Sequence, residues 1–268
     1  MLDSHKHIEN NKTLASGTRL RLLSYNIQVG IATTRPHHYV TRSWKHVFPH
    51  SQQYKNLDQI AEIITDYDIV GLQEVDGGSL RSDFVNQTQY LATKAKFPYW
   101  YHQANRRIGK IAQHSNGLLS NFNPIDIVDH KLPGPVPGRG AMVVRFGTEH
   151  NQLLIVLLHL ALGRRARMTQ LQYISELVKT HEHIVVMGDM NCQPDSFEMQ
   201  ALMEATGLLA PACDLNTFPS WKPSKKLDHI LISQSLLVEN FAVLDVACSD
   251  HLPISMEIVI PEEIQLVA

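Results

Sequence analysis

Cysteine is scarce in this sequence of 268 residues. The chain has three, Cys192, Cys213 and Cys248, and no pair has the CxxC spacing of many zinc sites. An odd number without such spacing indicates neither a disulfide framework nor a thiolate-bound metal, so we expect reduced thiols. Cys192 and Cys248 stand near conspicuous polar residues, but we interpret them as small packing residues rather than nucleophiles.

Long hydrophobic runs are also absent. The longest, Leu153 to Leu158, fits a buried strand and is far shorter than the roughly 18–20 residues that a membrane-spanning helix needs. Met1 to Lys12 is polar and lacks the basic-then-apolar pattern of a secretory signal. We therefore expect a cytoplasmic protein with a flexible tail over residues 1–17 and a single domain over residues 18–268.

Neither sign of charge is in excess. The 24 Lys and Arg residues against 26 Asp and Glu residues leave a formal net charge of −2. The sequence thus lacks the strongly basic footprint of many nucleic-acid binders, which argues weakly against non-specific binding to duplexes. The sequence does not exclude local basic patches, because cations cluster at Arg164, Arg165 and Arg167 and again at Lys222, Lys225 and Lys226.

Polar side chains follow a buried strand in the stretch Ile184 to Asn191. The apolar run Ile184–Met187 stops at Gly188 and is followed by Asp189 and Asn191. In an extended backbone, residues two apart point to the same side, so this carboxylate and amide would meet at the mouth of the strand. Taken alone, Gly-Asp-x-Asn is also ordinary turn chemistry.

The same arrangement recurs along the chain. An apolar strand pattern ends at Asn26, another leads into Gln73 and Glu74, and the run Leu153–Leu158 leads into His159. Two further acids stand near strand patterns, Asp228 at the start of one and Asp250, beside His251, before the last. An exposed Glu at a strand end or a satisfied core His explains any single case, but explains the whole set poorly.

Helices and loops complete the pattern. Apolar spacing predicts helices over about Tyr54–Tyr67, Phe84–Lys96 and Arg165–Lys179, and an Asp-x-x-Glu capping box at Asp195 predicts one ending near Ala205. Gly30–Ser51 reads as a long loop rich in His and Arg, either functional or a packed surface excursion. Pro133–Gly140 reads as a breaker-rich loop whose Arg139 faces either a phosphate or solvent.

The residue types favour phosphate chemistry. Carboxylate and amide oxygens with few thiols suit a hard cation such as Mg²⁺ or Mn²⁺. Phosphoryl hydrolysis requires a positioned water, neutralised phosphoryl oxygens and help for the leaving oxygen.

The motifs together resemble the endonuclease/exonuclease/phosphatase superfamily of DNase I-like phosphoesterases, over about Leu20 to Ile260. The resemblance implies a four-layered α/β sandwich, two packed mixed sheets flanked by helices, with the site at one end. The motifs that carry it are Ser24-Tyr25-Asn26, Leu72-Gln73-Glu74-Val75, Asn116-Gly117-Leu118-Leu119-Ser120, His159-Leu160, Gly188-Asp189-Met190-Asn191, Leu227-Asp228-His229-Ile230 and Ser249-Asp250-His251-Leu252-Pro253.

The resemblance also implies roles for individual residues. Glu74 would be the main ligand of Mg²⁺ or Mn²⁺, helped by Asn26 and Asp250. The remaining roles would be water activation by Asp189, phosphate contacts by Asn191, His159 and His251, and control of the His251 tautomer by Asp228. Substrate contacts are expected at Asn116, Arg139, Arg164 and Arg167. Some related nucleases carry an acid where this chain has Gln28, so one ion is expected rather than two.

The sequence does not decide between three classes of phosphate ester as the substrate. We expect a phosphate-ester hydrolase acting on phosphodiesters, with nucleic acid as the first candidate. Arg106, Arg107, Lys110, Arg164, Arg165 and Arg167 are cations that a nucleic-acid groove would need. A lipid-head-group phosphodiesterase, a small-molecule phosphatase and a catalytically silent binding module are the alternatives. The sequence does not determine the oligomeric state.

Overall fold

The computed structural model describes residues 17–33, 35, 51–135, 137–212 and 215–268. Residues 1–16 of the expected tail lie outside the described residues, and so do Cys213 and most of the His- and Arg-rich segment, namely residues 34 and 36–50. Gly17, assigned above to the tail, is the first residue of strand β1. The division into a tail and one domain stays a prediction.

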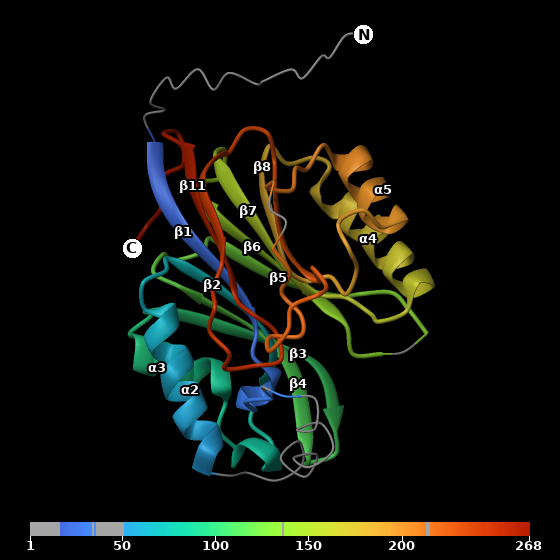
Figure 1. Cartoon of the computed structure of the whole chain (residues 1–268). Helices are drawn as coiled ribbons and strands as arrows, with labels where there is room; N and C mark the ends of the chain where they lie inside the picture. Colours follow the sequence, from blue (N-terminus) through green and yellow to red (C-terminus); the bar gives the residue numbers. More distant parts are fainter. Residues whose placement is uncertain (1–16, 34, 36–50, 136, 213–214) are drawn as a thin grey trace, which may run out of the picture.

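The strands form two mixed sheets that pack face to face (Figure 1). The six-stranded sheet has the order β10-β11-β1-β2-β4-β3, and the five-stranded sheet has the order β5-β6-β7-β8-β9. Strand β1 pairs in parallel with β2, and β7 with β8, whereas the other neighbours are antiparallel. The bounds are β1 Gly17–Asn26, β2 Ile69–Asp76, β3 Tyr99–Ile108, β4 Ala112–Ser120, β5 Asp126–Lys131, β6 Gly140–Gly147, β7 Gln152–His159, β8 His183–Asp189, β9 Asp228–Ile232, β10 Leu237–Val243 and β11 Ile254–Pro261.

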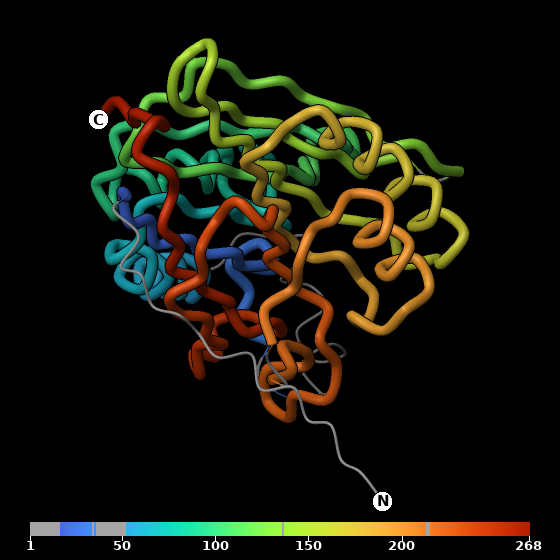
Figure 2. The backbone as a smooth tube through the Cα atoms, turned by 90° about the horizontal axis from the view of Figure 1, so that it is seen from above, coloured from blue at the N-terminus to red at the C-terminus, as the bar shows by residue number. Residues whose placement is uncertain are grey.

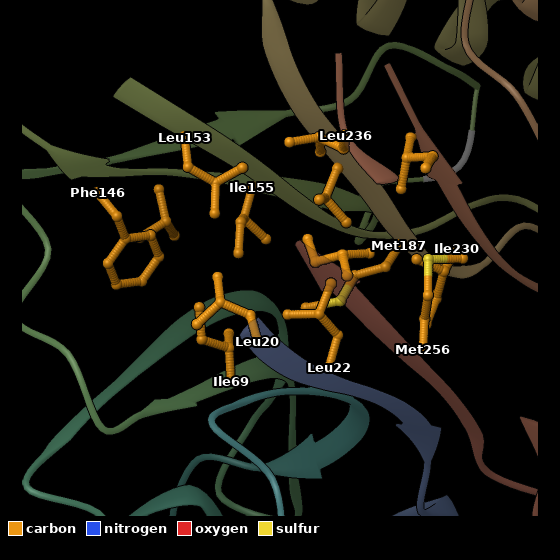
Figure 3. Packing of buried hydrophobic residues seen from close by; sticks show 14 of the residues in the cluster. Leu20, Leu22, Ile69, Phe146, Leu153, Ile155, Met187, Ile230, Leu236 and Met256 are labelled. Atoms are coloured by element: carbon orange, nitrogen blue, oxygen red, sulfur yellow. The ribbon is translucent and has the colours of Figure 1, made fainter. Parts of the chain in front are cut away.

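Both faces of the central strands are buried, which explains the unbroken apolar runs in the sequence. In β7, Leu153 and Ile155 point into the core between the sheets, whereas Leu154 and Val156 point outward toward the helices. Figure 3 shows Leu153 and Ile155 of the five-stranded sheet above Leu20 and Leu22 of β1.

Two pairs of helices cover the outer faces of the sheets. Helices α2 (Ser51–Ile64) and α3 (Gln87–Ala95) pack on the six-stranded sheet, and α4 (Arg164–Val178) and α5 (Phe197–Thr206) pack on the five-stranded sheet. Figure 2 shows the two pairs on opposite sides of the molecule. The expected four-layered sandwich is therefore confirmed. No helix in the described part of the chain is long and apolar enough to cross a membrane, and the cytoplasmic location stays a prediction.

Two expectations about local structure are wrong. Helix α3 begins at Gln87 rather than Phe84, because Asp83 and Phe84 have positive φ angles and Asn86 caps the helix by accepting from the amides of Thr88 and Gln89.

The predicted capping box does not form on α5. Ser196, not Asp195, is the N-cap residue, its side chain makes no capping hydrogen bond, and the Glu198 carboxylate pairs with Arg167 and Arg164. Strands β3, β5 and β10 were not anticipated from the sequence.

Candidate active site

Strand register brings three of the predicted residues together at one end of the five-stranded sheet. His159 at the end of β7 lies opposite Asp189 at the end of β8, and Asp189 lies opposite Asp228 at the start of β9. Asn26 ends β1 in the other sheet, and its Nδ2 donates to Asp189 Oδ2 at 3.1 Å. Polar groups from both sheets therefore meet at the same edge of the sandwich.

Gly188 permits the close approach of β8 and β7 beside this edge. Its φ is +144°, and an added Cβ would lie 1.9 Å from the carbonyl oxygen of Leu158. No other residue fits there without moving the strands. The glycine before Asp189 thus sets the distance between Asp189 and His159, whose Oδ2 and Nε2 atoms are 3.4 Å apart.

Glu74 lies on a β-bulge rather than at the strand end that the sequence predicts. The pairing of β2 with β4 shifts between Leu72 and Val75, and Glu74 has a φ of +54°, which is rare for a residue with a side chain. Bulges of this kind redirect a side chain next to functional sites. The Glu74 carboxylate is about one-third exposed, and its Oε1 lies 3.9 Å from His159 Nε2.

His251 and Asp228 form a hydrogen-bonded pair. His251 Nδ1 donates to Asp228 Oδ2 at 2.8 Å, and the hydroxyl of Thr217 donates to the same oxygen at 2.6 Å. His251 Nε2 is left pointing toward Asp189, 3.8 Å from Oδ2. Burial alone would lower the pKa of His251, but the carboxylates of Asp228 and Asp189 outweigh it and raise the pKa well above its usual value. The two carboxylates therefore favour the protonated form of His251.

His159 and Asp189 have pKa values shifted toward their neutral forms. Burial lowers the pKa of His159 well below its usual value, and the positive charges of Arg139 and His251 lower it further. Burial raises the pKa of Asp189 to about 7, against the opposing effect of His251. The cluster thus holds a buried carboxyl that can exchange a proton near neutral pH beside two imidazoles whose pKa values are shifted in opposite directions.

The oxygen atoms near Glu74 fit a hard divalent cation. Burial and the neighbouring Asp250 carboxylate raise the pKa of Glu74, and a cation between them would relieve that repulsion. Gln28 Nε2 donates to Asp250 Oδ2 at 3.1 Å, and its buried Oε1 has no hydrogen-bond partner. The side-chain amide of Gln28 thus contacts Asp250, and position 28 is where some related nucleases carry an acid.

A second group of possible ligands overlaps with this cluster. Asp189, Asp228 and His251 can each place one ligand atom within 4.8 Å of the others. His251 Nδ1 and Asp228 Oδ2 already bond to each other, however, so this trio suits proton transfer better than metal binding. We therefore assign the cation to Glu74, Asn26 and Asp250 as a proposal.

A cavity of about 370 Å³ adjoins Glu74 and His159. Arg139 lines it and is half-buried, and its guanidinium makes no hydrogen bond or ion pair with any described residue. Burial lowers the pKa of Arg139, and the carboxylates of Glu74 and Asp189 act in the opposite direction. Asn116 also lines the cavity, with its Nδ2 donating to the Gly140 carbonyl at 3.2 Å. Arg139 thus faces a cavity next to Glu74 and His159, and its contact with a phosphate stays a prediction.

Arg164, Arg167 and Asn191 line a different cavity, of about 430 Å³. Arg167 binds Glu198 Oε1 through Nε and Nη2 at 3.0 and 2.7 Å, so its guanidinium is already engaged. Arg164 is largely exposed, with its Nε 3.5 Å from Glu198 Oε2. The side-chain amide of Asn191 donates to the Leu160 carbonyl at 3.0 Å, and its backbone amide donates to Asp189 Oδ1.

Sequence reasoning missed His114 and Thr217. His114 lines the first cavity and lies two residues before Asn116 in β4, so it would have been found by extending the predicted strand to Ala112. Thr217 lies in a loop 11 residues before the Asp228 that it contacts, and no sequence pattern marks it.

The comparisons with known proteins address the family and the fold. Residues 23–251 match the model of the Endonuclease/Exonuclease/phosphatase family. No curated protein matches the chain significantly.

Solved structures share the fold at low sequence identity. An endonuclease/exonuclease/phosphatase family protein from Bacteroides thetaiotaomicron matches with a TM-score of 0.68 and 19% identity, covering 91% of this chain and 98% of the other. A mannosyl-6-phosphatase from the same organism matches with a TM-score of 0.67 and 18% identity, covering 90% and 99%. The human Nocturnin catalytic domain with bound sulfate matches with a TM-score of 0.66 and 17% identity, covering 90% and 94%.

Proposed function

Because this chain belongs to the Endonuclease/Exonuclease/phosphatase family, we propose that it is a divalent-metal-dependent phosphoesterase that hydrolyses phosphodiesters by in-line attack of an activated water. One observation carries the proposal. The Asp189 carboxyl, with its raised pKa, lies 3.8 Å from the His251 imidazole, whose pKa is also raised, and within hydrogen-bond reach of Asn26. An acceptor and a donor of protons thus face each other at the mouth of the sandwich.

Each residue then has a defined task. Glu74, helped by Asn26 and Asp250, would hold Mg²⁺ or Mn²⁺, which when bound neutralises charge on the phosphoryl oxygens. Asp189 orients the attacking water and takes its proton. His251, held by Asp228, donates to the phosphate, as would His159.

Three further residues contact the substrate in this proposal. Asn191, whose φ is +51° and whose Nδ2 donates to the Leu160 carbonyl, would be held in this strained conformation beside the phosphate. Arg139 supplies a half-buried cation for a phosphate oxygen, and Asn116 forms part of the cavity floor.

The two cavities support a diester over a monoester. One adjoins the cluster at Glu74 and His159, and the other adjoins it at Asn191. A scissile phosphate between them would carry a substituent in each cavity, as a phosphodiester does. Nucleic acid is the first candidate substrate, because Arg106 and Arg139 line the first cavity and Arg164 lines the second.

A small phosphomonoester is the second candidate. The cavity of about 370 Å³ has room for a sugar-sized group, and Arg139 has no ionic partner there among the described residues. The similar structures include both a mannosyl-6-phosphatase and Nocturnin, so the fold is compatible with either ester. A silent binding module is the least supported alternative, because Asp189, Glu74 and His251 are all present and close together.

The test is hydrolysis of a generic phosphodiester beside a generic phosphomonoester, with Mg²⁺, with Mn²⁺ and with chelator. Wild type should turn over the diester faster, only with metal, and Asp189→Asn should lose this turnover. Faster cleavage of the monoester would support the second candidate. No turnover of these esters, natural nucleic acids or phospholipids would contradict the proposal.

A further inference from the structure

The cavity beside Asn191 combines an exposed aromatic ring with cations. Phe197, the first residue of α5, is 61% exposed, and the Arg164 guanidinium lies 5.7 Å from the centre of its ring. Lys225 lines the same cavity and is exposed. We call the cavity formed around Asn191, Phe197, Arg164 and Lys225 the Phe197 groove.

The groove has a positive charge excess. Glu198 is its single carboxylate, and Arg167 and Arg164 already pair with it. Lys225 has no acidic partner among the residues that the structure describes. An anionic group is therefore attracted to this groove, and an exposed ring beside it offers a flat apolar surface.

The Phe197 groove lies next to the candidate catalytic residue Asp189. Asn191 lines it and follows Asp189 by two residues, with the Asn191 amide bonded to Asp189 Oδ1 at 3.0 Å. A volume of about 430 Å³ lies within the roughly 300–1,000 Å³ of small-ligand sites. A group bound in the groove thus adjoins the scissile phosphate.

We propose that the Phe197 groove binds the nucleoside next to the scissile phosphate, with its base stacked on Phe197 and its outer phosphate at Lys225. The proposal rests on the phosphodiesterase function and narrows its substrate to nucleotide diesters. A ligand that is both planar aromatic and anionic matches this surface, whereas a sugar phosphate or an acyl chain uses only one half of it. Stacking of a base on an aromatic side chain is tolerant of sequence, so no base preference is expected.

The test removes the ring from the protein and the base from the substrate. The substrates are a dinucleotide and two analogues in which one or the other base is replaced by hydrogen, cleaved in the presence of Mg²⁺. Phe197→Ala should lower kcat/KM on the dinucleotide about tenfold, mainly through KM, and should have no effect on the analogue that lacks the stacked base. Phe197→Trp should retain wild-type activity.

Phe84→Ala is the matched control. Phe84 is 63% exposed and lines another cavity with Arg107 and Lys110, but no candidate catalytic residue lines that cavity. The control should cleave all three substrates as wild type does. Phe197 is exposed, so its truncation removes no core contact, and circular dichroism should show an unchanged fold.

Two results would overturn the proposal. One is an equal loss with Phe197→Ala on the dinucleotide and both analogues, and the other is no loss on any of them. If wild type cleaves none of the three, the phosphodiesterase function fails separately. Equilibrium binding of the same dinucleotide to wild type and Phe197→Ala then still tests the groove, and equal affinity refutes it.

Discussion

Two buried carboxylates in this protein, Asp76 and Asp189, have opposite surroundings. Asp76 at the end of β2 pairs with Arg81, whose Nε lies 2.5 Å from Asp76 Oδ2. The Asp76 carboxylate also accepts hydrogen bonds from the amides of Gly78, Ser79 and Gln113 and from the hydroxyls of Ser79 and Ser82. Among the described residues, Asp189 accepts hydrogen bonds from only Asn26 and the amide of Asn191, and it otherwise faces two imidazoles.

Their pKa values differ in the expected directions. Burial alone would raise the pKa of Asp76, but Arg81 and the hydroxyls of Ser79 and Ser82 outweigh it and lower the pKa. For Asp189 the burial effect wins and the pKa rises. Both side chains have almost no exposed surface, but donors saturate the Asp76 carboxylate and make it a structural anion, whereas Asp189 has fewer donors and is available for proton transfer.

The largest expected effect is a loss of activity at the Asp189 site, where hydrogen-bond donors do not saturate the carboxylate. His251→Ala removes the proton donor opposite Asp189 and should lower kcat on a phosphodiester by about 10²–10⁴-fold. The variant should also be less stable, because it leaves the buried Asp228 carboxylate without its imidazole partner, so kcat is measured per folded molecule. If the variant is less stable but keeps full activity per folded molecule, His251 has a structural role, as Asp76 does, and not a catalytic one.

Asp76→Asn should give the reverse result. It leaves the buried Arg81 guanidinium without its counter-charge and should cost about 3–5 kcal/mol of unfolding free energy, measured by urea titration. Activity of the remaining folded protein should stay within tenfold of wild type. Adding Arg81→Met to Asp76→Asn removes the uncompensated charge. The double variant should therefore lose less unfolding free energy than the two single variants lose together.

Asp228→Asn should have an intermediate effect, because Asp228 acts through His251. We expect a loss of kcat of about 10–100-fold. Removing the carboxylate also removes what raises the pKa of His251, so activity should decline at a lower pH than in wild type. An unchanged pH profile with reduced activity would indicate that Asp228 only supports the fold.

The smallest effects lie in the pH dependence of metal-free stability, and they have opposite signs at the two carboxylates. The folded pKa of Asp76 is lowered, so its stabilisation is present above the usual pKa of about 3.9 and is lost as pH falls through the folded value. The folded pKa of Asp189 is raised to about 7, so ionisation at Asp189 costs stability as pH rises from about 4 to 7.

Urea titrations between pH 3 and 8 with chelator check both signs. The stability gap between wild type and Asp76→Asn should narrow toward acid pH. Asp189→Asn should become more stable relative to wild type as pH rises to 7. The same pH trend in both variants would refute the distinction between the two carboxylates.

The residues at strand ends could be predicted from the sequence because strand register alone positions them. Apolar runs buried on both faces mark β7 and β8, and their parallel pairing places His159 beside Asp189. The four-layered sandwich was implied by the family resemblance that the motifs carry, because the apolar runs alone would not have separated it from other α/β folds.

The remaining features depend on contacts between distant segments. The bulge at Glu74 is set by pairing with β4, and Thr217 reaches Asp228 through a loop. Asp76 lies two residues after Glu74, and nothing in the local sequence tells which acid is saturated by donors. Those donors come from residues 78–82 and from Gln113 on β4, which approach Asp76 only in the folded chain.

The most direct test of the account is the Mg²⁺ dependence of phosphodiester hydrolysis by wild type and by Glu74→Gln. The account predicts that Glu74→Gln is slower and needs a higher Mg²⁺ concentration for half-maximal rate, because the variant has lost the main proposed carboxylate ligand. Equal rates at limiting Mg²⁺ would contradict it and would remove Glu74 from the metal site.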